Sequence, residues 1–476
     1  MNIIGLPYFI FLFSVFILYW NLTFRKQNFL LLAASYFFYI CWDWRLSGLL
    51  FLVTLINFIF GRKIHSADSQ PLRKRWLLLT LVINVLILGY FKYTHFVISN
   101  IIEMLHFLKW NVSDVNVQII LPLGISFYIF QSLTYPLDIY RRKLQPINSF
   151  LDFAVYVAFF PKLIAGPIVR AKDFLLQLEK KRNFQWEGFQ NGCIRILTGY
   201  FKKVFIADTL SFYLVEPVFN DPGAYRTGSL WLAMVGYAVQ IYADFSGYSS
   251  MAIGAAKIFG FEIQENFLFP YLAIDFSDFW KRWHISVSTF FRDYLYFPMG
   301  GSRCGRARVF LNLMATMILC GLWHGPAWTF VLWGGAHGLY LVLNHFIIKP
   351  KSESNPAALK GDDPTFLSLA ASWLLTQLLV NFAWVLFRAK DIETAAHYLK
   401  GLFGSAGQSV IAVPPIVGYC FVAFVADHLM GWLSENKPEL ALRLYTRVGA
   451  VVYVSMILFL FHALPEKSNP FIYFQF

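Results

Sequence analysis

The chain has 476 residues, of which 58% are hydrophobic and only 14% charged. Soluble domains typically carry about 25% charged residues, so this composition excludes the two or three soluble domains that the length alone would suggest. The formal net charge of +13 could indicate nucleic-acid binding, but basic loops of membrane proteins more often set topology and contact anionic lipid. We therefore expect one polytopic domain over residues 1–476 in a lipid bilayer, with no nucleic-acid partner.

Long apolar runs recur along the whole chain. Ile3–Trp20, Trp76–Phe91 and Val331–Ile348 each approach the roughly 17–25 residues that are needed to cross a bilayer. We expect about eleven or twelve membrane-spanning helices, at residues 3–20, 28–42, 46–60, 76–91, 119–138, 194–216, 229–245, 308–322, 327–348, 366–387, 411–429 and 446–464. The predicted fold class is an all-α polytopic membrane protein. Its only polar linker covers residues 349–364.

Charge around the apolar runs predicts the orientation. No Lys or Arg precedes the first run, so the charged region that opens a cleavable signal peptide is missing. Arg25 and Lys26 follow this run, and the positive-inside rule then places the N-terminus outside the cytoplasm. Further basic clusters mark cytoplasmic loops at residues 62–63, 73–75, 141–143 and 303–308. The five scattered cysteines favour neither a disulfide framework nor a zinc site.

Two apolar regions do not fit simple crossings. Pro161 and the Gly166-Pro167 pair interrupt residues 150–174, and Pro270 and Pro298 interrupt residues 251–301. Broken backbone at membrane depth is tolerated only where it is buried in protein or lines a watery cavity. We therefore expect both regions to form re-entrant structure around a site.

The second region ends in the stretch FWKRWHISVSTFFRDYLYFPMGG, residues 279–301, which packs charges among aromatic residues. If it forms one helix, His284, Ser288 and Arg292 make a polar stripe at spacings of four residues. Pro298 and the following glycines predict a stop. The alternative is an interfacial amphipathic helix whose Lys and Arg side chains reach towards the headgroups.

A second histidine stands between two apolar runs. His324 follows the run ending at Leu322 and precedes Gly325-Pro326, where the proline predicts a break in the helix. Ionisable residues inside a bilayer are costly and indicate function, although a lone histidine can also be a hydrogen-bonded packing group. For His337, Tyr340 and Asn344, which share a face beyond it, we favour ordinary interhelical hydrogen bonds. No HExxH motif supports a metal site and no GxSxG motif supports a serine triad.

A third polar patch follows the expected span at residues 229–245. It contains Asp244, Ser246 and Tyr248. A carboxylate inside a membrane needs a partner, and the pair Lys202-Lys203 is a candidate.

These segments resemble the membrane-bound O-acyltransferases, and more closely the bacterial branch that acetylates alginate, peptidoglycan and cellulose. The resemblance runs nearly end to end. It rests on LPLGISFYIFQSLTYPLDIYR (121–141), FFPKLIAGPIVRA (159–171), DFSGYSSMAIG (244–254), DFWKRWHISVSTFFRDYLYFPMGG (278–301), GLWHGPAWTFVLWGGAHG (321–338), FAWVLFRA (382–389) and PFIYFQF (470–476). One departure is Ser250, where relatives often carry Asp.

The resemblance implies a ring of transmembrane helices around a thinned centre, where short tilted or re-entrant helices form a tunnel. Its core motifs span about residues 119–348. The resemblance also implies that His324 is catalytic and that His284 occupies the polar position of the upstream motif. A neutral imidazole has a pKa near 6.5 and can accept a proton from an attacking hydroxyl at neutral pH. We therefore expect His324 to be the general base and His284 its orienting or proton-sharing partner.

The expected reaction moves acetate from a cytoplasmic donor, most simply acetyl-CoA, to a polysaccharide outside a bacterial inner membrane. The resemblance favours a periplasmic partner of the SGNH serine-esterase type, and no cofactor or metal is expected. Further candidates for the tunnel and substrate are Trp323, Ser288, Arg292, Asp293, Tyr294, Lys281, Arg282, Asp244 and Ser246. Candidates for a basic rim that receives the donor are Arg303, Arg306 and Arg308.

Three alternatives stay open at this point. D-alanyl transfer to teichoic acid shares both histidine motifs within the same family. A transporter or polysaccharide flippase would show paired internal halves with interrupted helices, and no such symmetry is visible. A structural scaffold for a secreted transferase would need neither histidine.

Overall fold

The computed structural model describes residues 3–113, 119–164, 166–348, 365–404 and 407–462. The regular structure of these residues is helical, apart from one isolated bridge between Tyr225 and Ser409. The chain divides into two compact units, unit 1 with residues 1–197 and 249–264, and unit 2 with residues 198–248 and 265–476. The polar linker expected at residues 349–364 and the PFIYFQF motif at residues 470–476 lie outside the described residues.

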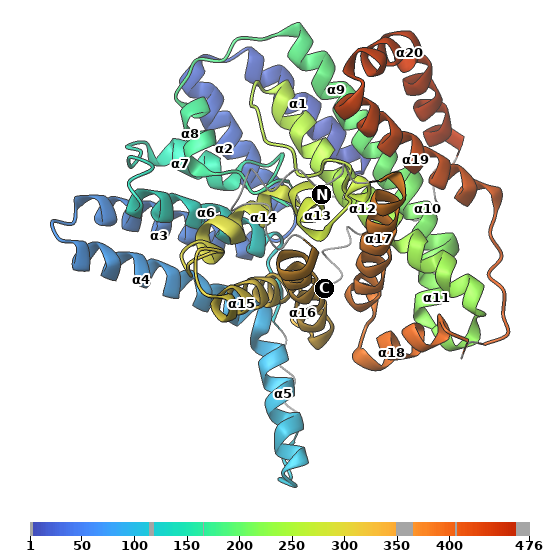
Figure 1. The fold of residues 1–476 in the computed structure, drawn as a ribbon. Helices are drawn as coiled ribbons and strands as arrows, with labels where there is room; N and C mark the ends of the chain where they lie inside the picture. The colour runs from blue at the N-terminus through green and yellow to red at the C-terminus, as the bar shows by residue number, and fades with distance from the viewer. Residues whose placement is uncertain (1–2, 114–118, 165, 349–364, 405–406, 463–476) are drawn as a thin grey trace. The chain divides into compact units, whose positions relative to one another are not determined.

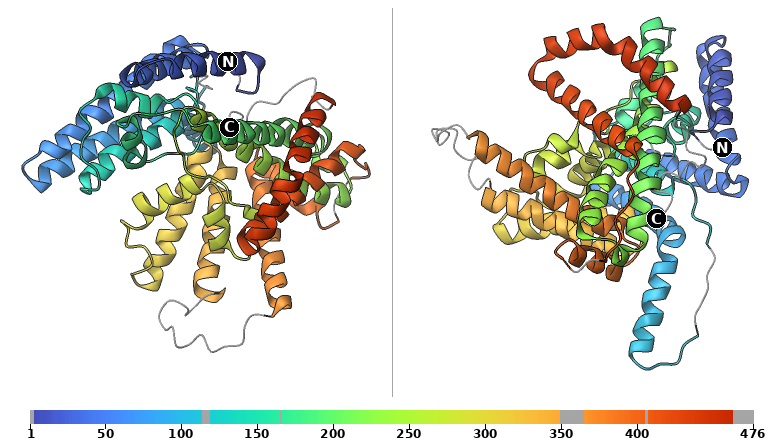
Figure 2. Two further views of the ribbon diagram at one scale, coloured as in Figure 1. Left: turned by 90° about the horizontal axis from the view of Figure 1, so that it is seen from above. Right: turned by 90° about the vertical axis from the view of Figure 1, so that its right-hand side faces the viewer.

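The helices of unit 1 include its short connectors. They are α1 (Leu6–Trp20), α2 (Phe24–Ile40), α3 (Trp44–Ser66), α4 (Gln70–Leu88), η1 (Gly89–Tyr93), α5 (Thr94–Phe107), α6 (Ile125–Tyr140), α7 (Phe150–Ala158) and α8 (Ala171–Leu178). Two longer helices run on from one unit into the other along the chain, α9 (Trp186–Phe201) and α12 (Thr227–Ile258). Figures 1 and 2 show α5 projecting from unit 1, and none of its residues is buried.

The helices of unit 2 follow in chain order. They are η2 (Lys202–Ala207), α10 (Asp208–Leu210), η3 (Ser211–Val215), α11 (Glu216–Asn220), η4 (Pro222–Ala224), η5 (Pro270–Leu272), α13 (Phe276–Arg282), α14 (Ile285–Phe291), η6 (Arg292–Tyr296), α15 (Arg306–His324), α16 (Trp328–Leu343), η7 (Asn344–Ile348), α17 (Phe366–Arg388), α18 (Ile392–Gly401), α19 (Pro415–Asn436) and α20 (Pro438–His462). In Figure 1, α15, α16 and α17 lie together beside the short helices α13 and α14.

The packing of unit 1 centres on α3, α4 and α6, which lie side by side (Figure 1). The Asn57 amide donates to Asn84 Oδ1 at 3.1 Å and to Ser132 Oγ at 3.3 Å, which joins the three helices. Such polar contacts hold helices together where lipid supplies no hydrophobic drive. Gly61 lets α3 approach α6 closely, because a Cβ there would lie 2.3 Å from the Tyr135 ring.

Each expected membrane span overlaps helix within the described residues, and the all-α polytopic fold class is confirmed. Seven helices within the described residues are long and apolar enough to cross a bilayer, and α1 is a shorter apolar helix. The expected span at residues 194–216 is interrupted, since α9 passes into the wider turns of η2 and η3. The expected total of eleven or twelve crossings therefore stays a prediction.

Helix is interrupted in both regions where a break was expected, residues 150–174 and 251–301. α7 ends at Ala158 before Pro161, and the chain becomes helical again only in α8. After α12, regular helix resumes only in short pieces from Pro270 onwards. Side chains of neighbouring helices donate hydrogen bonds to one backbone carbonyl at or beside each break. Gln131 donates to the Tyr156 carbonyl at 2.7 Å in unit 1, and Gln377 of α17 donates to the Ala273 carbonyl at 2.8 Å in unit 2. Backbone that leaves the helix inside a membrane needs such hydrogen-bond partners, because lipid supplies none.

Candidate active site

His324 is the last residue of α15, and Gly325 directly after it is extended. The expected break before Pro326 is therefore confirmed. Gly325 is required for packing, because a Cβ there would lie 2.1 Å from the Phe330 ring. α16 then returns antiparallel along α15, and Gly334 permits the close contact because its Cβ would meet the Met317 carbonyl at 2.3 Å. This tight hairpin fixes the position of the His324 side chain, which is buried.

His284 lies at a second break, and here the single-helix prediction for residues 279–301 is wrong. α13 ends at Arg282, α14 begins at Ile285, and His284 between them has φ 43° and ψ 53°. This left-handed conformation is uncommon for residues other than glycine. The break separates α13 from α14, so the helix that carries Ser288 begins only after His284. The expected stop near Pro298 is confirmed, since the helical turns end at Tyr296.

Asn266 explains this break, and sequence reasoning missed it. Its backbone carbonyl accepts the Ile285 N–H at 2.9 Å, and its side-chain oxygen accepts the Ser286 N–H at 3.2 Å. The Ser286 hydroxyl donates to the same oxygen at 2.8 Å. Asn266 is fully buried. It therefore caps the start of α14 from a distant segment, so that the turn at His284 does not depend on local sequence.

The two breaks bring both histidines together within unit 2. Their ring centroids lie 6.1 Å apart, with the ring planes at 51°. Trp323 packs beside both of them, with its ring 4.9 Å from that of His324 and 5.8 Å from that of His284. Phe245 of α12 packs edge-on against His284 at 4.5 Å. Two imidazoles from separate segments thus face one small region, which a chance packing histidine would not require.

The environment of His284 favours its neutral form. The side chain is completely buried, and it lies between α13 and α14, outside the helices long enough to span a membrane. Burial disfavours the charged form and lowers the pKa of the His284 imidazole from its ordinary 6.5 to about 3. A neutral imidazole can accept one hydrogen bond and donate another. His284 can therefore orient a partner without adding charge to the site.

A cluster of aromatic rings continues from His324 along α16. Trp333 packs against His324 at 5.0 Å and against His337 at 4.8 Å, and Trp280 lies 5.1 Å from His337. The expected hydrogen bonding of His337 is wrong, because both of its buried ring nitrogens lack a hydrogen-bond partner among the described residues. The expectation holds for Asn344, which donates to Asp275 at 3.5 Å.

The buried carboxylate of Asp244 has the partner that was expected. Lys203 Nζ lies 2.6 Å from Asp244 and 2.7 Å from Asp208, and all three side chains are buried. Lys202 turns elsewhere and pairs with Asp427 at 2.8 Å, a partner that the sequence did not indicate. The Lys203–Asp244 pair joins η2 to α12, next in the chain to Phe245, whose ring contacts His284, and the Lys202–Asp427 pair joins η2 to α19.

The other expected site residues lie around the breaks, most of them engaged with neighbours. Ser288 donates to the Trp283 carbonyl at 3.0 Å, and Arg292 pairs with Asp293 at 2.8 Å. Arg282 pairs with Glu435 at 2.7 Å and with Asp278 at 3.0 Å. Ser246 is buried, and the Tyr294 ring packs on Phe290 at 4.9 Å. Lys281, Arg303, Arg306 and Arg308 are exposed, and so is Arg292.

Comparisons with known proteins agree with this arrangement. Residues 8–356 match the model of the membrane-bound O-acyltransferase family. The probable alginate O-acetylase AlgI of Azotobacter vinelandii is 40% identical over 390 residues, which cover 81% of this chain and 74% of that protein. The peptidoglycan O-acetyltransferase of Helicobacter pylori is 35% identical over 433 residues, covering 85% of this chain and 77% of that protein. The teichoic acid D-alanyltransferase of Bacillus subtilis is 29% identical over 243 residues, covering 48% and 60%.

Proposed function

Because this chain belongs to the membrane-bound O-acyltransferase family, we propose that it acetylates an extracytoplasmic polysaccharide with acetate from a cytoplasmic donor. The protein is a membrane-embedded O-acyltransferase. The observation that carries the finer assignment is the pair of buried histidines, whose rings lie 6.1 Å apart where two broken helices meet. Transfer of a small acyl group needs a base in a site shielded from water, and both of these imidazoles are buried.

His324 is the general base in this proposal. The acceptor hydroxyl attacks the carbonyl carbon of the thioester, and His324 takes the hydroxyl proton as the C–O bond forms. The tetrahedral intermediate then expels the thiolate, which receives this proton from the imidazolium. The indole N–H of Trp323 and backbone N–H groups at the helix breaks are candidate donors to the oxyanion. No covalent acyl-enzyme is needed, and no group is oxidised or reduced.

His284 orients the base or the donor. Its left-handed backbone and its capped neighbour Ser286 fix the imidazole in one place. A positioned group can contribute to rate without touching the proton, because correct geometry removes part of the entropic barrier. Loss of His284 should therefore affect turnover less severely than loss of His324.

Acetyl-CoA is the proposed donor, and an SGNH-type esterase outside the bacterial inner membrane is the proposed next acceptor. Support for acetate comes from the acetylases, which match about four-fifths of the chain, whereas the D-alanyltransferase matches 48%. The alginate and peptidoglycan relatives leave two polysaccharide classes as proposed end products. The predicted orientation, with the N-terminus outside, rests on the charge pattern around Arg25 and Lys26.

Transport of label into proteoliposomes of defined orientation tests this proposal. Radiolabelled acetyl-CoA is supplied on the side that carries the basic loops, and alginate or peptidoglycan fragments with a candidate esterase are supplied on the other side. The proposal expects labelled ester on the far side only. Labelled product from a D-alanyl carrier protein but not from acetyl-CoA would replace it with D-alanyl transfer.

A further inference from the structure

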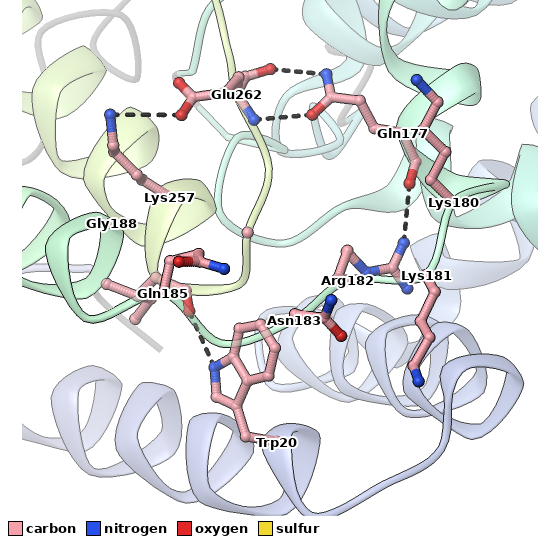
Figure 3. Close-up of a pocket in the computed structure, with 12 residues that line it drawn as sticks. Trp20, Gln177, Lys180, Lys181, Arg182, Asn183, Gln185, Gly188, Lys257 and Glu262 are labelled. Carbon is pink, nitrogen blue, oxygen red and sulfur yellow. Dashed lines mark hydrogen bonds and ion pairs between the residues drawn. The ribbon is translucent and has the colours of Figure 1, made fainter.

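A basic pocket in unit 1 has no part in the histidine site. It opens where four helix ends meet, namely the ends of α1, α8 and α12 and the start of α9 (Figure 3). Its cavity of about 310 Å³ lies at the lower end of the range found for small-molecule sites. Every residue that lines it belongs to unit 1.

The charge of this pocket is strongly one-sided. Lys180, Lys181, Arg182 and Lys257 line it, and Glu262 is the one carboxylate among its lining residues. Lys180 and Lys181 are exposed, so their ammonium groups can swing towards a bound group. Lys257 contacts Glu262 at 3.4 Å, but that carboxylate is 74% exposed. Such a surface contact is weak, and an incoming anion can therefore compete for Lys257.

Arg182 supplies a fixed positive charge in the lining of the pocket. It donates to the Tyr19 hydroxyl, to Asn28 Oδ1 and, at 3.1 Å, to the Gln177 carbonyl. Its guanidinium also lies 4.7 Å from the Phe261 ring centroid. Because the Arg182 side chain is buried and held by several hydrogen bonds, it would lose little conformational entropy when an anion binds.

Neutral hydrogen bonds hold the walls in place. Gln177 and Glu262 pair through two bonds, with the Glu262 N–H donating at 2.8 Å and the Glu262 carbonyl accepting at 2.9 Å. The Trp20 indole donates to the Ile258 carbonyl at 3.1 Å, so its flat ring forms part of the lining (Figure 3). The pocket is thus preformed, with exposed lysines at its edge.

We propose that this pocket binds a phosphate-bearing anion. Lysine ammonium groups suit phosphate oxygens as point charges, and a buried arginine adds charge without further loss of side-chain freedom. Two sources carry this chemistry. One is the phosphorylated nucleotide end of a coenzyme A thioester, in which case the inference rests on the proposed function. The other is the headgroup of an anionic lipid, which Arg25 and Lys26 at the start of α2 would meet at a cytoplasmic surface.

Direct binding measurements on the full chain test this inference. The parent protein is placed in nanodiscs of neutral phosphatidylcholine and titrated calorimetrically with adenosine 3′,5′-bisphosphate. A second arm measures retention of phosphatidylglycerol by native mass spectrometry. The test variant combines Lys180→Gln, Lys181→Gln and Lys257→Gln. The control combines Lys74→Gln, Arg75→Gln and Lys143→Gln, three exposed cations of the same unit that do not line the pocket.

We expect the test variant to bind its anion about tenfold more weakly than the parent and the control to bind like the parent. Glu262→Gln should bind more tightly, because it frees Lys257, and added salt should weaken binding by the parent. If the test variant binds adenosine 3′,5′-bisphosphate more weakly than the parent, the ligand is the nucleotide end of a soluble donor. If it only retains less phosphatidylglycerol, the ligand is a lipid headgroup. Equal binding by parent and test variant in both arms overturns the inference. Neither arm requires turnover, so a failure of the proposed acetyl transfer would be seen separately.

Discussion

The side-chain oxygen of Asn266 accepts both the backbone N–H and the hydroxyl of Ser286, at 3.2 and 2.8 Å. These bonds hold the first turn of α14 and thereby the left-handed residue His284 before it. In the proposed reaction Asn266 would therefore be a positioning residue, because it acts through the placement of His284.

Replacement of Asn266 by Ala should lower both stability and turnover. The change leaves buried donors of Ser286 unsatisfied, which costs about 1–3 kcal/mol, and it releases His284 from its strained conformation. We expect kcat for acetyl transfer to fall at least about tenfold with little change in KM for the donor. Melting in detergent and steady-state kinetics on the folded fraction measure the two effects.

Asn84→Ala is the matched control for this prediction. Asn84 is also buried and bonds the side chain of Asn57, but it lies in unit 1 between α4 and α3. It should lower the melting temperature without lowering kcat of the folded protein. Equal loss of kcat in both variants would show that Asn266 acts through general stability alone.

The sequence alone predicted the all-α fold class and the helix breaks in both proline-containing regions. Both features depend on short stretches of neighbouring residues, namely the length of an apolar run and the geometry that a proline imposes. The sequence also indicated Lys202-Lys203 as the partner of Asp244, since a buried carboxylate needs a cation, but it did not distinguish Lys203 from Lys202. It failed at His284, where a helical stripe was expected. The turn there is imposed by Asn266, eighteen positions upstream, and no local pattern encodes such a cap. The pocket around Arg182 escaped notice for a related reason, because its cations come from separate helix ends.

Acidification should destabilise the parent through His284. Burial lowers the pKa of this imidazole to about 3, from 6.5 in the unfolded chain. The folded state thus prefers the neutral form, so the stabilising contribution is complete above pH 6.5 and is lost as pH falls towards 3. His284→Asn should show a smaller fall in melting temperature between about pH 6.5 and pH 4.5 than the parent. Parallel pH profiles would contradict the buried neutral histidine.

The same position separates orientation from proton transfer. Asn can retain a hydrogen bond that Ala cannot, so His284→Asn should keep more acetyl transfer than His284→Ala. Initial rates at matched protein level measure the difference. Equal losses would instead assign His284 an obligatory proton-transfer step, and unchanged rates in both would remove it from the site.

Lys203→Met should unfold the protein more readily than Asp208→Asn. Removing the lysine leaves two buried carboxylates without their cation, and breaking such a buried pair typically costs about 3–5 kcal/mol. Asp208→Asn leaves Lys203 paired with Asp244 at 2.6 Å and should cost less. Denaturation midpoints in detergent rank the two variants. The reverse order would show that the cluster does not depend on Lys203.

Neutralising Arg303, Arg306 and Arg308 together distinguishes a donor rim from a topology signal. If these exposed residues receive the donor, the KM for acetyl-CoA should rise in correctly inserted protein, and added salt should weaken donor binding by the parent. If they only set topology, accessibility labelling of the flanking loops should change while KM does not. Unchanged KM and unchanged labelling would defeat both assignments.

The most direct test of the account is the acetyl-transfer rate of His324→Ala in proteoliposomes, compared with the parent at matched amounts of inserted protein. Ala leaves the α15–α16 hairpin intact, since the close contacts there involve Gly321, Gly325 and Gly334. Removal of a general base typically costs about 10²–10⁴ in rate, and we expect a loss of this size in kcat with normal insertion and melting temperature. Acetyl transfer within about twofold of the parent would contradict the assignment of His324 as the base.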